Sequence, residues 1–349
     1  MKRILVLFTV VTFSVGIVFA DEAVLIDFSK LVPDILQGQQ EQGVLPQNKQ
    51  TVMDFSTNAG SSFTAEQKSV MKTSLAIENW LVKLAQSSQT VQNESLSFTK
   101  SAASKQFSNV MGVRVHFPVA NFNSYAKILP PFDIPAYEFT AVDDQGVISK
   151  PDEKPAATRF ENGYGIIKNV GAVKAIAVEA YGLNFPCTLS AILIDGSGKE
   201  QVVFLGALTY DGWAQLRWDN PQYIQNVRNR TYHLNPLYPI QAPYIKFGGF
   251  IVQRDATNAQ IVDTDFVTYF KEVRVIYDKA ELEVDRDIND EDTWKIIEDR
   301  EAAKAKIEAK DFGKDQVFRY LEQRKQATEA NFTDPVAGEG GAAGAGAAQ

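Results

Sequence analysis

Two tryptophans carry the side chains with the clearest capacity for recognition. Trp213 and Trp218 flank the stretch Ala214–Arg217, between two segments that resemble strands. Aromatic side chains with polar neighbours on a loop can stack on sugar rings or anchor a protein interface. They can equally pack a long loop onto a sheet, because tryptophan has a large apolar surface. Together with Tyr223 and Tyr238 they are the candidate interface or glycan contacts.

The chain offers few side chains for acid–base or metal chemistry. Its 349 residues include two histidines and one cysteine, too few for an internal disulfide or a cysteine-rich zinc site. His116 shares the polar face of an alternating segment with Arg114, which favours an exposed strand histidine, and His233 has no Cys or His neighbour. Phosphate-loop, metalloprotease, serine-hydrolase and dinucleotide motifs do not occur in the sequence. We therefore expect no enzyme, no catalytic residue, no cofactor and no metal site.

Two short motifs resemble ligand-binding loops. The run Gly196–Lys199 lacks the upstream glycine and following helix of a phosphate loop, so it predicts a hairpin turn. Asp285 begins an acidic run like the start of a calcium loop, but Asp290 replaces the required glycine and Ile296 the bidentate acid. Acidic residues at a helix start explain that run more simply, because the helix dipole favours negative charge there.

The first 20 residues have the three-part pattern of a secretory signal peptide. Lys2 and Arg3 precede an apolar run that ends in small residues at Ala20. This run is shorter than the ~20 residues that span a bilayer, which favours cleavage over a membrane anchor. We expect cleavage between Ala20 and Asp21, and no membrane anchor in the mature chain.

Export and charge limit the remaining functions. The 43 acidic residues outnumber the 35 basic ones, which argues against nucleic acid as a partner. In an oxidising compartment Cys187 would have no internal partner. A buried, small apolar side chain is the favoured interpretation, because free cysteine is among the most buried residue types. An intermolecular bridge is the alternative.

Alternating apolar residues predict a mainly β fold. Short strands separated by glycine and proline turns indicate an antiparallel jelly roll or β-sandwich of the galactose-binding-like type. The predicted strands are Trp80–Ala85, Val113–Phe117, Val173–Tyr181, Leu189–Ile194, Gln201–Leu208, Tyr244–Gln253 and Val267–Tyr277.

Composition divides the mature chain into four parts. Residues 21–110 predict an N-terminal extension with a helix and the first strand or strands, and residues 111–284 predict the sandwich body. Residues 285–330, rich in Glu, Lys, Arg, Ala and Gln, predict a charged helical arm, and the Gly/Ala-rich residues 331–349 predict a flexible tail.

The helix in the N-terminal extension has a recognisable start. Thr64 and Gln67 are spaced as a capping box, in which each side chain bonds the other residue's backbone N–H. We expect this helix to run over Ala65–Ile77.

An ordered set of segments resembles a known family. The set follows the signal peptide and comprises Asp21–Phe28, Met111–Val115, Pro135–Glu138, Phe160–Gly165, Leu216–Pro221, Tyr269–Val273, Ile276–Ala280 and Asp290–Trp294. Together these segments resemble the spirochaete flagellar filament outer-layer (sheath) protein family, FlaA. The resemblance extends from the signal peptide to about Phe332.

The resemblance implies a non-enzymatic structural subunit of periplasmic flagella. Such a subunit is exported to the periplasm, coats a core of flagellins and contributes to stiffness, shape and motility. Its implied partners are flagellin core subunits and other copies of itself or related sheath proteins. The alternative is a periplasmic carbohydrate-binding module acting on cell-wall glycans, with Trp213 and Trp218 as its aromatic platform.

Overall fold

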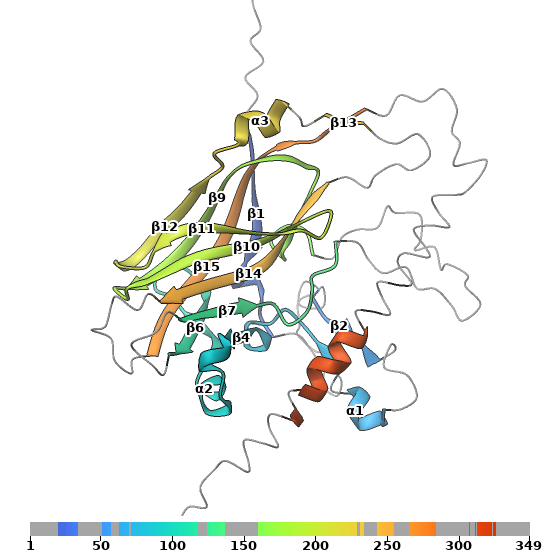
Figure 1. Ribbon diagram of the computed structural model, residues 1–349, viewed down its shortest axis with the longest axis vertical. Coiled ribbons are helices and arrows are strands. Elements are labelled where there is room, and N and C mark those ends of the chain that lie inside the picture. Colours follow the sequence, from blue (N-terminus) through green and yellow to red (C-terminus); the bar gives the residue numbers. More distant parts are fainter. Residues whose placement is uncertain are drawn as a thin grey trace, which may run out of the picture.

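Two antiparallel sheets packed face to face form the body of the molecule (Figure 1). The computed structural model describes residues 20–33, 51–56, 63–69, 71–117, 124–136, 160–228, 231–233, 243–254, 265–283, 307, 311, 313–322 and 324–325. The chain passes repeatedly between the two sheets, as in a jelly roll. The predicted antiparallel β-sandwich is confirmed.

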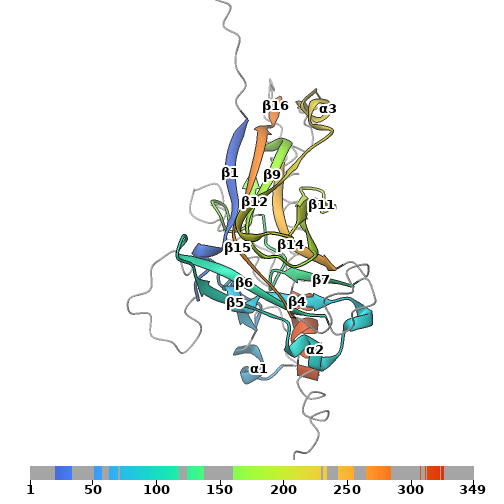
Figure 2. The same cartoon turned by 90° about the vertical axis from the view of Figure 1, so that its left-hand side faces the viewer.

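The first sheet has the strand order β12–β9–β15–β6–β5, and β1 also pairs with β15. Figure 2 shows β1 running alongside β15. The strands are β1 (Asp21–Asp27), β5 (Phe98–Ala103), β6 (Asn109–His116), β9 (Val170–Leu183), β12 (Asp211–Asp219) and β15 (Asp265–Lys279).

The second sheet has the order β11–β10–β14–β7–β4, and β8 also pairs with β14. Its strands are β4 (Leu81–Leu84), β7 (Ser124–Leu129), β8 (Ile166–Lys168), β10 (Cys187–Asp195), β11 (Glu200–Ala207) and β14 (Tyr244–Arg254). The predicted β10–β11 hairpin is confirmed: Gly198 N–H donates to the Asp195 carbonyl at 2.9 Å across the turn.

Small elements cover the ends of the sandwich. Two-residue β2 (Met53–Asp54) pairs with β3 (Lys72–Thr73), and β13 (Thr231–His233) pairs in parallel with β16 (Glu281–Glu283). The helices are α1 (Ala65–Ser69), α2 (Val91–Ser95) and α3 (Tyr223–Arg228), and the 3-10 turns are η1 (Phe28–Lys30), η4 (Ile77–Asn79) and η5 (Gln86–Ser88).

The predicted helix over Ala65–Ile77 is too long. Its capping box is confirmed, because Thr64 N–H donates to Gln67 Oε1 at 3.0 Å and Gln67 N–H to Thr64 Oγ1 at 3.2 Å. The helix ends at Ser69, however. Ser74 Oγ accepts the Ala76 N–H at 3.2 Å, a local bond that competes with helix formation.

Phenylalanines fill the space between the sheets. Phe28 lies within 6.5 Å, centroid to centroid, of Trp80, Phe247, Phe250 and Phe270. Two core residues only three positions apart, Phe247 and Phe250, both face inward because the register of β14 against β10 shifts between them. Such a bulge reorients one side chain relative to regular alternation.

The predicted extension and body are not separate in the structure. β1, β4 and β5 all come from residues 21–110, yet β1 and β5 belong to the first sheet and β4 to the second. The sandwich therefore begins at the start of the predicted mature chain.

The described residues of the predicted arm are helical. Residues 307, 311, 313–322 and 324–325 form what we call the C-terminal helix, coloured orange-red in Figure 1. Val317 is 9% exposed and belongs to the core, and Tyr320 packs against it. The signal segment 1–19 and the tail 331–349 lie outside the described residues.

Candidate interaction site

The predicted loop that carries both tryptophans is a strand. Trp213 and Trp218 lie in β12, which pairs antiparallel with β9 along its whole length. Because side chains alternate along a strand, residues five apart point to opposite faces. Trp218 packs inward against the core with Leu216, whereas Trp213 faces outward. The prediction of one two-tryptophan platform on a loop is therefore wrong.

Trp213 packs the turn between β5 and β6 against the outer face of the first sheet. Its ring packs edge-on against Phe107, in the β5–β6 turn, at 4.9 Å and against Tyr181 of β9 at 5.3 Å. Tyr181 continues the contact to Tyr269 of β15 at 5.9 Å. Gly112 of β6 makes room for the last ring, because an added Cβ would lie 3.1 Å from Tyr269 Cε1. This aromatic row gives Trp213 a packing role.

The described contacts of Tyr223 are with residues other than these tryptophans. Tyr223, at the start of α3, donates from Oη to Asp278 Oδ2 at 2.6 Å, and the Lys174 ammonium lies 5.7 Å from its ring centroid. These contacts tie α3 to β15 and β9. Tyr238 lies outside the described residues, and its role as a contact stays a prediction.

His116 has a carboxylate partner that the local sequence did not reveal. Asp265, opposite it in β15, lies 2.7 Å from His116 Nδ1 and also accepts a bond from Arg114. Burial alone would raise the pKa of Asp265, but the bonds from His116 and Arg114 outweigh it and lower the pKa. Ser97 Oγ accepts the backbone N–H of His116 at 2.9 Å and does not bond its ring. Ser97, His116 and Asp265 therefore do not form a catalytic triad.

Beside the aromatic row, two acidic residues are cross-strand neighbours in the first sheet. Glu179 of β9 lies opposite Glu272 of β15. Burial and the charge of Glu272 raise the pKa of Glu179, and Arg274 only partly offsets this. Arg274 also bonds Glu272, and Glu22 of β1 at 3.0 Å, so the outer face is held by charge pairs between strands.

Cys187 is 3% exposed, so the prediction of a buried cysteine is confirmed. Burial raises the pKa of its thiol to about 12, despite the nearby positive charge of Arg254. Among the described residues, no three His, Cys, Asp or Glu side chains are grouped to hold a metal ion. The predicted calcium-like run at 285–291 lies outside them.

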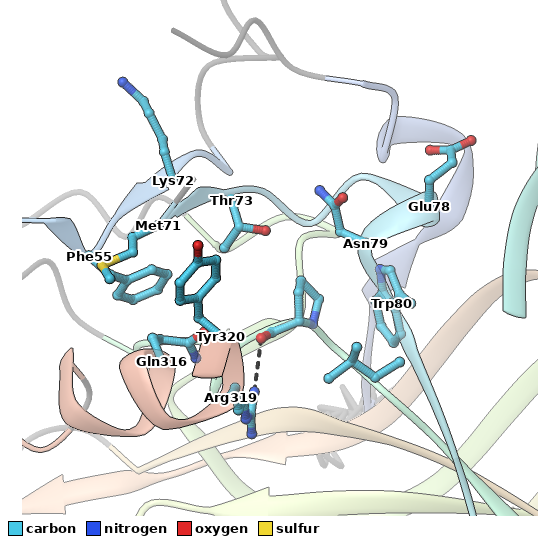
Figure 3. Close-up of a pocket in the computed structure, with 12 residues that line it drawn as sticks. Phe55, Met71, Lys72, Thr73, Glu78, Asn79, Trp80, Gln316, Arg319 and Tyr320 are labelled. Carbon is cyan, nitrogen blue, oxygen red and sulfur yellow. Dashed lines mark hydrogen bonds between the residues drawn. The ribbon is translucent and has the colours of Figure 1, made fainter. Parts of the chain in front are cut away.

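A pocket of about 340 Å³ lies between the C-terminal helix and the segment around β2 and β3 (Figure 3). Aromatic and thioether groups of Phe55, Met71, Trp80 and Tyr320 line it. Its main donors are already used: Arg319 Nη1 donates to the Pro131 carbonyl at 2.8 Å and Trp80 Nε1 to the Leu75 carbonyl at 3.0 Å. The Arg319 bond joins the helix to the segment that follows β7.

Among the described strands, the most exposed large hydrophobic side chains lie on β11, at one edge of the second sheet. Val202 is 55% exposed and Phe204 is 58% exposed. The sequence predicted this strand but not its open face, because apolar residues occupy both faces of the run Val202–Leu205 and suggest burial on both sides. No helix within the described residues has the length and apolar character needed to cross a membrane.

Comparison with known sequences decides the family. A sequence model of the family described as flagellar filament outer layer protein FlaA matches residues 45–286, which include most strands of both sheets. The chain belongs to this family. The family resemblance predicted from the ordered segments is confirmed.

Outer layer proteins from two spirochaetes match nearly the whole chain. The flagellar filament outer layer protein of Treponema pallidum (strain Nichols) is 44% identical over 343 residues, covering 95% of this chain and 97% of the relative. That of Spirochaeta aurantia is 42% identical over 320 residues, covering 90% of each chain. The family relationship therefore extends well beyond the matched 45–286.

Solved structures with a similar β-sandwich are much more distant from this chain. One carbohydrate-binding module of the β-sandwich superfamily is 9% identical, with a TM-score of 0.29 over 58% of each chain. A module solved with β-1,4-galactotriose is 8% identical, with a TM-score of 0.27 over 57% of this chain and 88% of that chain. Likeness at this level does not bear on ligand binding.

Proposed function

We propose that this chain is an exported structural subunit of the outer layer, or sheath, of periplasmic flagellar filaments. In this role it coats the flagellin core, contributes to stiffness, shape and motility, and catalyses no reaction. The observation that carries the proposal is membership of the outer layer family, with relatives aligned over 95% and 90% of the chain.

The first strand supports export with cleavage at the predicted site. β1 begins at Asp21, whose backbone pairs with Tyr277 and whose carboxylate lies 2.9 Å from Lys279 Nζ. Cleavage between Ala20 and Asp21 would therefore leave the first sheet complete. A chain that folds after cleavage can deliver an intact sandwich to the filament in the periplasm.

A rigid sandwich suits a subunit that must transmit force. The two sheets share one core of buried aromatic and aliphatic side chains, so the outer faces are fixed before any partner binds. Flagellin core subunits and other copies of this chain, or related sheath proteins, are the proposed partners.

Purified periplasmic filaments test this function. We expect the chain in the filament fraction at a constant ratio to flagellin, and thinner, more flexible filaments in cells that lack it. A variant without residues 1–20 is the matched control and should not reach the filament. Absence of the chain from filaments, or filaments of unchanged diameter without it, would contradict the proposal.

The glycan-binding alternative loses the feature on which it depended. A platform needs both rings on one surface, whereas Trp213 faces outward and Trp218 packs against the core. The ring of Trp213 also packs against Phe107 and Tyr181. We therefore propose the sheath function alone.

A further inference from the structure

The backbone of β11 has an open edge. Within the described part of the chain, β11 pairs only with β10 (Figure 1). The Asp195 N–H donates to the Lys199 carbonyl at 3.2 Å, so that carbonyl points toward β10. Because backbone groups alternate in direction along a strand, those of Glu200, Val202 and Phe204 point away from β10. Such a row of amide groups is a template for another strand.

The side chains beside this edge are apolar and unprotected. Val202 and Phe204 are more than half exposed on the outer face, while Val203 and Leu205 are buried beneath. Lysine, proline and bulges are the usual devices that keep edge strands from pairing. The run Glu200–Phe204 has no lysine or proline, and the shift in the register of β11 against β10 lies just beyond it, between Phe204 and Gly206. This edge is therefore built to accept a strand.

We propose that β11 pairs antiparallel with β11 of a second copy of this chain, about a two-fold axis at Val203. In this register Val202 of each copy lies directly opposite Phe204 of the other. Aromatic and β-branched residues are a favourable cross-strand pair. The register shift between Phe204 and Gly206 ends the regular part of β11, so the pairing is confined to Val202–Phe204, which carries no charge. The amide groups of Val202 and Phe204 exchange about four hydrogen bonds across the axis.

Self-complementarity is what selects a second copy as the partner. A two-fold contact places each surface against itself, so the surface must be complementary to itself. β11 satisfies the condition with one pairing repeated twice, Val202 against Phe204. The inference rests on the proposed function, in which copies lie side by side in one layer, and it names one contact between them. The contact joins the second sheets of two subunits into one continuous sheet.

Two double variants test the register with equal changes in polarity. Val202→Glu with Phe204→Glu sets glutamates opposite each other across the axis, whereas Val202→Lys with Phe204→Glu sets lysine opposite glutamate. We expect sedimentation velocity of the full exported chain to show a reversible dimer. The Glu/Glu variant should weaken it by about tenfold or more, and the Lys/Glu variant by about threefold or less. Ile224→Glu, which changes a 68% exposed residue on α3, should leave the dimer unchanged.

A proline variant tests the backbone contact separately. The Val202 N–H points away from β10, so Val202→Pro costs the sandwich no ladder bond and the variant should fold. It should weaken the dimer by about tenfold or more, whereas Val202→Ala, which keeps the N–H, should weaken it by about threefold. Circular dichroism and thermal unfolding of each variant report whether the sandwich is intact.

The outcomes separate this inference from the proposed function. A chain that stays monomeric at all concentrations, or a dimer equally strong in every variant, would overturn the β11 contact. A Lys/Glu variant as weak as Glu/Glu would overturn the two-fold register. Monomeric chains whose β11 variants fail to bind filament cores would assign the edge to another filament subunit and also overturn it. A dimer absent from filaments would contradict only the sheath function.

Discussion

Lys271 Nζ lies 2.6 Å from Asp27 Oδ1, and both side chains are only 14% exposed. Ser29 donates its backbone N–H to the same oxygen at 3.0 Å and its hydroxyl at 2.6 Å. The pair joins the end of β1 to β15 and so holds the first strand in the sheet. Burial alone would raise the pKa of Asp27, but the bonds from Lys271 and Ser29 outweigh it and lower the pKa.

Removing the Asp27 charge should destabilise the fold. We expect Asp27→Asn to lower the free energy of unfolding by about 3 kcal/mol, because the mostly buried Lys271 ammonium loses its nearer anion and keeps Glu272 Oε2 at 3.6 Å. Asp219→Asn is the matched control, since the Arg217–Asp219 pair is 43% and 69% exposed, and it should cost less than about 1 kcal/mol. Urea unfolding at neutral pH measures both. Equal losses would show that β1 does not depend on its ion pair.

The same pair predicts a pH dependence. The folded-state pKa of Asp27 is lowered, so its contribution is complete above the unfolded-state pKa of about 3.9 and is lost as the pH falls toward the folded-state pKa. The stability difference between wild type and Asp27→Asn should therefore shrink as the pH falls below about 4. Urea unfolding at a series of acidic pH values measures this difference. A constant difference would contradict the lowered pKa.

Gly249 allows the bulge in β14. Its φ is +127°, and an added Cβ would collide with the Ile128 carbonyl oxygen of the neighbouring strand. We expect Gly249→Ala to cost about 3 kcal/mol or more, because both the backbone strain and the collision must be relieved. Gly198→Ala is the control: its φ is +80° but its Cβ would meet nothing within 4 Å, so it should cost about 1 kcal/mol. Similar melting temperatures for the two variants would contradict this account.

The long strands could be predicted because their alternation survives over many residues. β14 and β15 each extend a predicted segment by only a few residues. β12 was missed although Ala214, Leu216 and Trp218 alternate with polar residues, because Trp213 interrupts the alternation and the small Ala214 weakens the apolar signal. Local hydrogen bonds at Ser74 shortened the predicted N-terminal helix in a way that periodicity does not register.

The contacts of the candidate residues could not be predicted, because they join distant parts of the chain. Asp265 reaches His116 across 149 positions, through the register of β15 against β6. Phe107 reaches Trp213 only because the β5–β6 turn lies over the outer face of the first sheet. Register and turn geometry decide these pairs, and neither is visible in a local pattern.

Trp213 and Trp218 should respond differently to truncation. Trp218→Ala removes a ring that packs against the core and should cost about 2–3 kcal/mol. Trp213→Ala removes the contact with Phe107 and should cost about 1–2 kcal/mol, with faster amide hydrogen exchange concentrated in residues 104–108. If amide hydrogen exchange in residues 104–108 accelerates equally in both variants, Trp213 does not stabilise the β5–β6 turn.

Cys187 should be unreactive in the native chain. Its thiol is buried and its pKa is raised to about 12, so almost no thiolate forms near neutral pH. We expect a thiol reagent to label Cys187 only when denaturant unfolds the sandwich. Ile224→Cys, which adds a thiol at a 68% exposed position on α3, is the control and should label one site quickly in the native state. Formation of an intermolecular disulfide needs an accessible thiolate. Protein from purified filaments should therefore run as a monomer on non-reducing electrophoresis. A dimer that depends on Cys187 would instead support the alternative of an intermolecular disulfide.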